Sequence, residues 1–333
     1  MENQTIFITG ITGQDGTFLA SKLINEKNNL KIYGTTRSKD DKGFFSKLDV
    51  INKELNEKSI DLLSLNLEED SEVRDVFHKI KPDYVINLSG PSSVNESLSD
   101  NNKTKDSINK IFDNLINSSM ELEKLPSFFE AGSSEMFSNK NKNPLNEDSK
   151  FETRSPYARA KYENFVRIKE LRESYGWDIK TGIMFNHESE FRPRGYLFSK
   201  LINEALQIKN KELETIEVGS LSYIRDWSFA GDVADAIYLI AFSHIPEDFV
   251  IGSGTGNSIE ELIQIIFEEL DLDYKKHIKI NEKLLRDGDP EVIISDPSKL
   301  KDMLGWNPKL NFRDLVKRCL NYKLTTTYRV TTV

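Results

Sequence analysis

Strand-like runs alternate with helix-like segments through the first 186 residues, and this alternation most constrains the fold. Short apolar runs are followed repeatedly by segments whose apolar residues recur at helical spacing. The predicted strands are 5–9, 30–35, 60–66, 84–88, 127–131 and 180–185, and the predicted helices between them are 17–26, 71–80, 108–123 and 157–174. Consecutive βα units of this kind predict an α/β fold with a Rossmann-type, doubly wound parallel sheet.

The pattern becomes less regular after residue 186. The predicted helices there are 198–208, 233–242 and 259–270, and the predicted strands are 215–218 and 249–251. We therefore predict a first domain over residues 1–186 and a smaller C-terminal α+β lobe over residues 187–325. Some segments of this lobe are expected to return to the main sheet.

Charge and cysteine content limit the classes of function. The net charge of −9 argues against broad binding to nucleic acids or anionic membranes. The single cysteine, Cys319, forms no intrachain disulfide and fits a reducing compartment. Neither a membrane-spanning run nor a leader-like start is evident, so we expect a cytoplasmic protein. The four histidines, at 78, 187, 244 and 277, lack metal-ligand spacing, so no metal is predicted.

The loop after the first predicted strand is rich in glycine. In TGITGQDG, Gly10, Gly13 and Gly16 stand between a strand and a helix. Glycines allow a tight turn there and let the backbone approach a pyrophosphate at the helix N-terminus. The alternative is a merely structural turn. That alternative is preferred for the second glycine cluster, 252–256, because Ser258 and Glu261 after it form the pattern of a capping box.

The end of the second strand indicates which dinucleotide binds. NAD sites usually carry an acidic residue there for the ribose 2′-hydroxyl, whereas this chain has Gly34, Thr35, Thr36 and Arg37. A cation with neighbouring hydroxyls suits a 2′-phosphate, so NADP is favoured over NAD. The alternative is that Arg37 is an ordinary surface arginine.

A second candidate site surrounds a tyrosine and a lysine. Tyr157 and Lys161 are four residues apart and share a helix face, where the ammonium lowers the pKa of the phenol. The same spacing recurs at 196–200, so the pattern alone has little specificity. Ser133 and Glu135 distinguish the first copy, because they follow a predicted central strand. Two residues apart along that strand, they are expected to point to the same face.

These motifs together resemble a known family. The stretches TGITGQDG, SSEMF, SPYARAK, FNHES, RDWSFAGDV and LGWNPK run from residue 6 to about residue 310. They resemble the extended short-chain dehydrogenase/reductases, and within them most closely the GDP-mannose 4,6-dehydratases. The resemblance implies a GDP-sugar substrate, either GDP-mannose or a GDP-manno-heptose. It also implies oxidation at C4, elimination of water across C5 and C6, hydride return to C6, and a homodimer or homotetramer.

The resemblance also implies roles for individual residues. Ser133 would hydrogen-bond and polarise the sugar, Glu135 would be the base and acid of the elimination, and Tyr157 the phenolate base supported by Lys161. The implied cofactor contacts, besides Tyr157 and Lys161, are Gly10, Ile11, Thr12, Gly13, Gln14, Asp15, Gly16, Arg37, Asn66, Leu67, Leu88, His187 and Arg192, with Arg194 as an alternative to Arg192. The implied contacts of the nucleotide sugar, besides Ser133, are Ser92, Asn186, Lys200, Arg225, Arg286 and Glu291.

Two other functions remain open at this point. An NAD(P)-dependent C4 dehydrogenase, reductase or epimerase on nucleotide sugars would need Tyr157 and Lys161 but would have no use for Glu135. A non-catalytic sensor would keep the fold alone, and the intact Ser133, Tyr157 and Lys161 argue against it.

Overall fold

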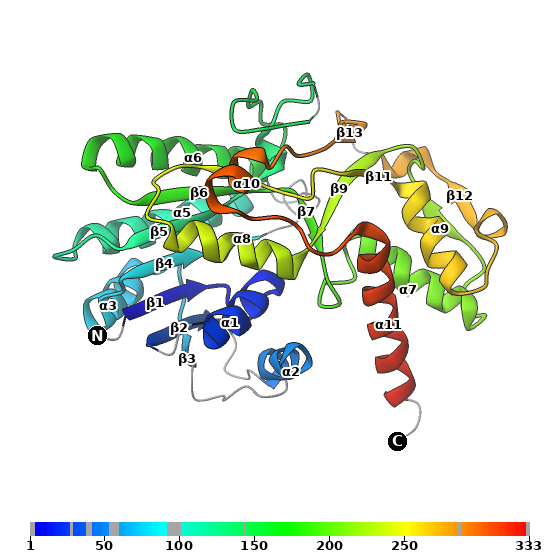
Figure 1. The fold of residues 1–333 in the computed structure, drawn as a ribbon, viewed down its shortest axis with the longest axis horizontal. Helices are drawn as coiled ribbons and strands as arrows, with labels where there is room; N and C mark the ends of the chain where they lie inside the picture. Colours follow the sequence, from blue (N-terminus) through cyan, green and yellow to red (C-terminus); the bar gives the residue numbers. More distant parts are fainter. Residues whose placement is uncertain are drawn as a thin grey trace.

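A computed structural model describes residues 4–26, 29–37, 42–52, 60–91, 101–142, 144–285 and 288–330. Its main body is a seven-stranded parallel sheet with the order β10-β6-β5-β4-β1-β2-β3 (Figure 1). The strands are β1 (Gln4–Thr9), β2 (Leu30–Thr36), β3 (Ile60–Ser64), β4 (Tyr84–Asn87), β5 (Ser127–Ser133), β6 (Ile179–Met184) and β10 (Phe249–Ile251). This order confirms the doubly wound sheet, and β10 is a segment of the second half of the chain that returns to it.

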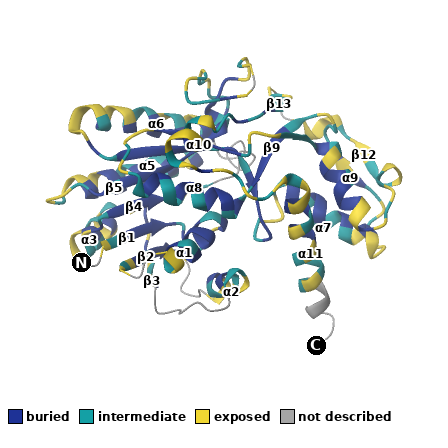
Figure 2. Cartoon of the chain, viewed as in Figure 1, coloured by how far each residue is buried: buried dark blue, intermediate teal, exposed yellow. Residues whose placement is uncertain are grey.

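Helices cover both faces of the sheet because successive strand residues point to opposite sides. Ile6 and Ile8 of β1 pack in one cluster with α1 and α8, whereas Phe7 packs in another with α3, α5 and α6. The helices of the main body are α1 (Gln14–Glu26), α2 (Lys42–Ile51), α3 (Asp70–Ile80), α5 (Asn101–Met120), α6 (Pro156–Tyr175), α8 (Ala230–Phe242) and α10 (Ser298–Leu304). Figure 2 shows the buried residues of the strands lying between these two layers of helices.

The second half of the chain builds the smaller α+β lobe, on the right in Figure 1. Its strands are β7 (Asn186–Glu188), β8 (Ile216–Val218), β9 (Ile224–Phe229), β11 (Gly256–Ser258), β12 (Ile278–Ile280) and β13 (Val292–Ile293), and its helices are α7 (Leu197–Lys209), α9 (Ile259–Glu269) and α11 (Phe312–Val330). The three helices share one apolar cluster that includes Phe198, Leu262 and Leu315. The capping box of Ser258 and Glu261 is present at the start of α9, as its sequence pattern predicts.

The observed elements differ from the predicted ones at their ends, and several observed elements were not predicted. β5 extends to Ser133, two residues past the predicted end, because its pairing with β6 continues to that residue. A 3-10 turn, η2 (Ser134–Met136), follows at once. The sequence pattern did not predict the helices α2, α10 and α11 or the strands β7, β9, β11, β12 and β13.

Candidate active site

The site lies at the carboxyl edge of the sheet, where the strand order reverses. β1 lies between β2 and β4, so the chain winds away from β1 in both directions. Ligands of doubly wound sheets bind in the crevice at such a switch point. The loop at residues 10–16, Leu88 after β4, and Ser133 at the end of β5 all belong to this edge.

The glycine loop forms a backbone cradle that side chains would fill. Gly10 has a positive φ of 65°, and a Cβ there would lie 2.8 Å from the carbonyl oxygen of Leu88. A Cβ on Gly16 would lie 2.5 Å from the carbonyl oxygen of Gly10. The N–H of Gly13 donates to that same carbonyl at 2.9 Å, and α1 begins at Gln14. Because the first N–H groups of a helix lack partners within it, this cradle fits the pyrophosphate of a dinucleotide.

Gln14 and Asp15 reach from the start of α1 to β7. Asp15 lies 3.0 Å from His187 Nε2, and Gln14 Nε2 donates to the His187 carbonyl at 3.3 Å. The hydroxyl of Ser189 donates to Gln14 Oε1 at 2.7 Å. Burial raises the pKa of Asp15, but the charge and hydrogen bond of His187 outweigh it and leave that pKa below its usual value. Burial lowers the pKa of His187, but Asp15 outweighs it and leaves the pKa raised.

Two cations flank the loop on the side of β2. Arg37 is exposed just after β2, at the position expected to read the ribose. Lys47 of α2 donates to the carbonyl oxygen of Thr12 at 2.9 Å, and its burial lowers its pKa. Ile11 is fully buried, and its side chain packs against Gly34 of β2, so it supports the glycine loop from that strand. Lys47 was missed by the sequence analysis, because neither α2 nor its packing against the loop was predicted.

The remaining expected cofactor positions follow β3 and β4. Asn66 is exposed, and its backbone N–H donates to Glu72 Oε2 at 3.0 Å. Leu67 is buried, and its carbonyl oxygen accepts a hydrogen bond from Asn114 Nδ2 at 2.9 Å. Leu88 is half-buried beside Gly10. All three lie at the edge that carries the glycine loop.

Tyr157 lies in the first turn of α6, next to the end of β5. Pro156 opens the helix, and the hydroxyl of Ser155 caps it by accepting the N–H of Ala158 at 3.1 Å. Tyr157 is buried and hydrogen-bonds Ser133. Burial raises the pKa of the Tyr157 phenol, and although Lys161 and Ser133 oppose this effect, the pKa stays above its usual value. Lys161 thus acts in the expected direction, but burial outweighs it in the free protein.

Lys161 is buried one helical turn further along α6. Its Nζ donates to the carbonyl oxygen of Ala131 at 2.7 Å and to Glu130 Oε1 at 3.3 Å. Glu130 was not predicted as a site residue, because a single acidic residue inside a predicted strand gives no signal of the helix it will face.

Glu135 lies beside Ser133 and Tyr157, but the expected geometry was wrong. We expected Glu135 to lie on the strand of Ser133, whereas β5 ends at Ser133 and Glu135 belongs to the turn η2. The N–H of Glu135 donates to the Ser133 hydroxyl oxygen at 3.2 Å, which closes the turn. Its half-exposed carboxylate is near enough to Tyr157 to raise the pKa of the phenol. A turn rather than a strand therefore brings the carboxylate to the tyrosine.

The expected nucleotide-sugar positions lie in the second lobe and around it. Asn186 begins β7, next to His187 in sequence. Lys200 of α7 donates to the carbonyl oxygen of Glu217 at 3.4 Å. Glu291 is exposed just before β13. Ser92 and Arg286 lie outside the described residues.

Arg225 of β9 already has an anionic partner. Its Nη2 lies 3.1 Å from Asp289 Oδ2, and its Nη1 donates to the carbonyl oxygens of Ile224 at 2.9 Å and Glu291 at 3.3 Å. The guanidinium is therefore held beside the segment that precedes β13. A substrate phosphate that bound this guanidinium would compete with the Asp289 carboxylate.

The two arginines of FRPRGY differ in their surroundings. Arg192 Nε lies 3.3 Å from Glu188 Oε2, and its guanidinium lies over the ring of Tyr196, 3.7 Å from the centroid. Arg194 is exposed. Both alternatives for the cofactor-binding arginine stay open.

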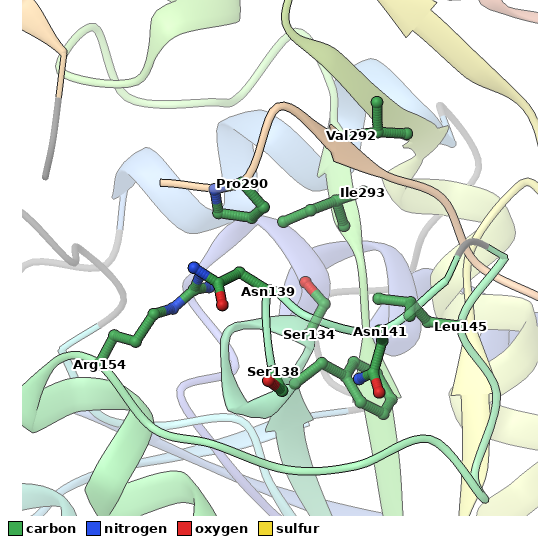
Figure 3. A pocket seen from close by; sticks show the side chains of 10 residues that line it. Ser134, Ser138, Asn139, Asn141, Leu145, Arg154, Pro290, Val292 and Ile293 are labelled. Carbon is green, nitrogen blue, oxygen red and sulfur yellow. The ribbon is translucent and has the colours of Figure 1, made fainter. Parts of the chain in front are cut away.

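A shallow pocket that opens to solvent borders the site (Figure 3). It lies between the segment after β5 and the segment around β13. Its lining includes Ser134, Phe137, Ser138, Arg154, Pro290 and Ile293. Ser134 and Pro290 are the sequence neighbours of Ser133 and Glu291, so the pocket adjoins both the expected catalytic edge and the expected nucleotide-sugar segment.

Within the described ranges, no three histidine, cysteine, aspartate or glutamate side chains gather as they would around a metal ion. Likewise, none of the helices in the described part of the chain is long and apolar enough to cross a membrane.

Comparison with known proteins agrees with this geometry. A family model described as "GDP-mannose 4,6 dehydratase" matches residues 7–319. GDP-mannose 4,6 dehydratase 2 of Arabidopsis thaliana is 30% identical over 323 residues, which cover 95% of this chain and 86% of that protein. A dTDP-glucose 4,6-dehydratase from Streptomyces venezuelae superposes with a TM-score of 0.83 at 16% identity, covering 98% of each chain. A UDP-glucose 4-epimerase from Thermotoga maritima superposes with a TM-score of 0.82 at 21% identity, covering 97% of this chain and 100% of that one. These two structures share the fold, and the family match over nearly the whole chain establishes that the protein belongs to the GDP-mannose 4,6-dehydratase family of NAD(P)-dependent hydro-lyases.

Proposed function

We propose that the protein converts GDP-mannose, or a GDP-manno-heptose, to the GDP-4-keto-6-deoxy sugar, with NADP as its cofactor. The observation that carries this proposal is the position of the Glu135 carboxylate beside Ser133 and Tyr157. A redox enzyme or epimerase needs a tyrosine base but no carboxylate at this point. Elimination of water needs both, because two different protons are moved.

The cradle of residues 10–16 would hold the cofactor, since its glycines leave room for a pyrophosphate at the N-terminus of α1. When bound there, NADP would take a hydride from C4 of the sugar and return it to C6. Arg37 and Lys47 are the cations that would bind a ribose 2′-phosphate, and their location beside β2 and Thr12 favours NADP over NAD. Arg192 is the preferred contact from the FRPRGY segment.

The catalytic side chains would divide the proton transfers between them. Tyr157 would take the proton of the C4 hydroxyl as C4 is oxidised, and Lys161 would favour the phenolate. The resulting ketone acidifies the hydrogen at C5, so Glu135 can remove that proton as a carboxylate. Once protonated, Glu135 would give its proton to the departing C6 hydroxyl, which leaves as water. When hydride returns to C6, C5 would take up the proton that Tyr157 received from the C4 hydroxyl. Ser133 would hold the sugar oxygen, because its hydroxyl already joins Tyr157 to the Glu135 backbone.

The nucleotide end of the substrate would bind to the second lobe. Arginines suit a pyrophosphate, since a guanidinium can donate two parallel hydrogen bonds to it. The proposed contacts are Ser92, Asn186, Lys200, Arg225, Arg286 and Glu291. In this division residues 1–186 carry the cofactor and the catalytic groups, and residues 187–325 mainly hold the nucleotide sugar. We expect a homodimer or homotetramer.

Product analysis tests this function directly. The purified protein is incubated with NADP and each of a panel of GDP-, UDP-, CDP- and dTDP-linked sugars. The masses of the products are then measured by mass spectrometry. Loss of one water from the GDP-sugars alone is expected. An isomer of unchanged mass would support an epimerase instead, and a loss or gain of two hydrogens would support a dehydrogenase or reductase.

A further inference from the structure

Glu130 is a buried acid that the mechanism above does not use. It lies on β5 with an exposed fraction of 1%, and its side chain faces α6. Glu130 Oε1 accepts hydrogen bonds from Lys161 Nζ at 3.3 Å and Asn164 Nδ2 at 3.5 Å. Glu130 Oε2 accepts one from Asn87 Nδ2 at 2.6 Å. A charged group so deeply buried requires partners of this kind, and here they come from β4 and α6.

The orientation of Asn87 is determined by its other neighbours. Its Oδ1 accepts the backbone N–H of Ser89 at 3.2 Å and the hydroxyl of Thr9 at 2.6 Å. Thr9 must donate this hydroxyl proton, because its oxygen already accepts the backbone N–H groups of Leu88 at 3.1 Å and of Ser89 at 3.2 Å. The amide NH₂ of Asn87 therefore has to face Glu130.

The surroundings of Glu130 consequently offer donors to both of its oxygens. An ionised carboxylate accepts at both oxygens and has no hydrogen of its own to place, whereas a carboxylic acid or an amide would direct a hydrogen toward one of these donors. Burial raises the pKa of Glu130, opposed by the charge of Lys161 and by the hydrogen bonds of its neighbours. Burial leaves the pKa of Glu130 above its usual value, whereas the donors at both of its oxygens favour the ionised form.

Lys161 donates hydrogen bonds to two groups of β5. Of its three N–H donors, one reaches Glu130 and one reaches the carbonyl oxygen of Ala131 at 2.7 Å. Both acceptors belong to β5, so the ammonium is held against the strand that ends at Ser133.

We propose that Glu130 is a positioning residue whose carboxylate is the counter-ion of Lys161, holds its ammonium against the Ala131 carbonyl and so sets the charge that Tyr157 meets. This inference rests on the proposed function in one respect, namely that Tyr157 is the base at the C4 hydroxyl. The hydrogen bonds from Thr9 through Asn87 to Glu130 also connect the end of β1, where the glycine loop begins, to the catalytic lysine.

The charges around the tyrosine give the sign of the expected effect. Tyr157 faces Lys161 of its own helix, Glu135 of η2 and Tyr196 at the start of α7, besides the Ser133 hydroxyl. Glu130 faces Lys161 as its charged partner. Removing the Glu130 charge leaves the ammonium uncompensated, which favours the phenolate. The pKa of Tyr157 should therefore fall, and a phenolate of lower pKa is a weaker base.

The Glu130→Gln variant tests this in two independent ways. The first is the pKa of Tyr157, taken from the tyrosinate absorbance that Tyr157→Phe removes, with and without Glu130→Gln; it needs no sugar nucleotide. We expect a fall of about one unit or more. The second is the pH profile of turnover, whose acid limb should move to lower pH by a similar amount while its plateau falls.

Two further variants make the result decisive. Glu163→Gln removes an exposed charge of α6 that pairs with Lys105 at 2.7 Å, and should move neither readout. Glu130→Asp keeps the charge at a greater distance from Lys161 and should lower the pKa of Tyr157 by a smaller amount. This variant replaces Glu130→Gln as the test if Glu130→Gln does not fold. An unchanged or raised pKa of Tyr157 would overturn the role of Glu130. A lowered pKa in a protein that fails to dehydrate any sugar would instead contradict the proposed function alone.

Discussion

His187 Nε2 lies 3.0 Å from the carboxylate of Asp15, and this pair joins the first turn of α1 to β7 across 172 residues of sequence. Both side chains are mostly buried, and Gln14 adds a second link to the His187 carbonyl. The glycine loop is thereby tied to the strand that begins the second lobe. The pair has consequences for stability as well as for the cofactor site.

The stability from this pair should depend on pH in a defined way. Because the pKa of His187 is raised on folding, its contribution is complete below its unfolded value of about 6.5 and is lost as the pH rises through the folded pKa. Because the pKa of Asp15 is lowered, its contribution holds above its unfolded value and is lost as the pH falls through the folded pKa. We expect His187→Gln to reduce the free energy of unfolding at mildly acidic pH and much less at alkaline pH.

Urea unfolding of both proteins across this pH range measures the difference. His78→Gln is the matched control, since His78 pairs with Glu121 at 3.1 Å on the surface, where ion pairs contribute little. A destabilisation by His187→Gln that stayed constant with pH would show that packing, and not the charge pair, is responsible.

Glu135→Gln should stop elimination while leaving the fold intact. The amide keeps the shape of the side chain but cannot remove the C5 proton, so dehydration should fall about 100-fold or more. Cofactor binding, measured by fluorescence titration, should be unchanged. For the unmodified enzyme, turnover in deuterated water should place one deuterium at C5, and a deuterium label at C4 should appear at C6. Full dehydration by the variant would move the protein to the reductase or epimerase class.

Arg37 and Lys47 should together set the preference for NADP. We expect the protein to bind NADP about ten-fold or more tightly than NAD, a difference of about 1.4 kcal/mol. Arg37→Ala should remove most of this preference and leave NAD binding nearly unchanged, and Lys47→Met should remove part of it. Lys42→Met serves as a control because Lys42 is an exposed cation on the same helix. Equal affinities of the unmodified protein for the two cofactors would contradict this assignment.

Arg225 and Asp289 should act in opposite directions on substrate binding. Arg225→Ala removes a guanidinium proposed to bind the pyrophosphate, so KM should rise about ten-fold or more with a smaller change in kcat. Asp289→Asn removes the carboxylate 3.1 Å from that guanidinium, so KM should fall. Steady-state kinetics with the active GDP-sugar measure both, and Arg225→Lys separates charge from bidentate geometry. If KM changed in neither variant, Arg225 would only support β9 and β13.

Much of the fold follows from local sequence patterns. The strand and helix periods predict the doubly wound sheet because each element must bury a face, and strand ends on the carboxyl side then have to share one edge. The glycine loop was predictable for the same local reason, since Gly10 needs a positive φ and Gly16 admits no side chain. The helical spacing of Tyr157 and Lys161 needs no tertiary information either.

The tertiary structure alone decided how the charged groups are paired. Glu135 lies off the strand because the pairing of β5 with β6 ends at Ser133, and the turn that follows moves the carboxylate off the alternating pattern. Glu130 was an unremarked strand residue until α6 packed over it and supplied Lys161, 31 residues away. Each of these outcomes depends on hydrogen bonds between elements distant in sequence, whose partners are chosen only when the layers pack together.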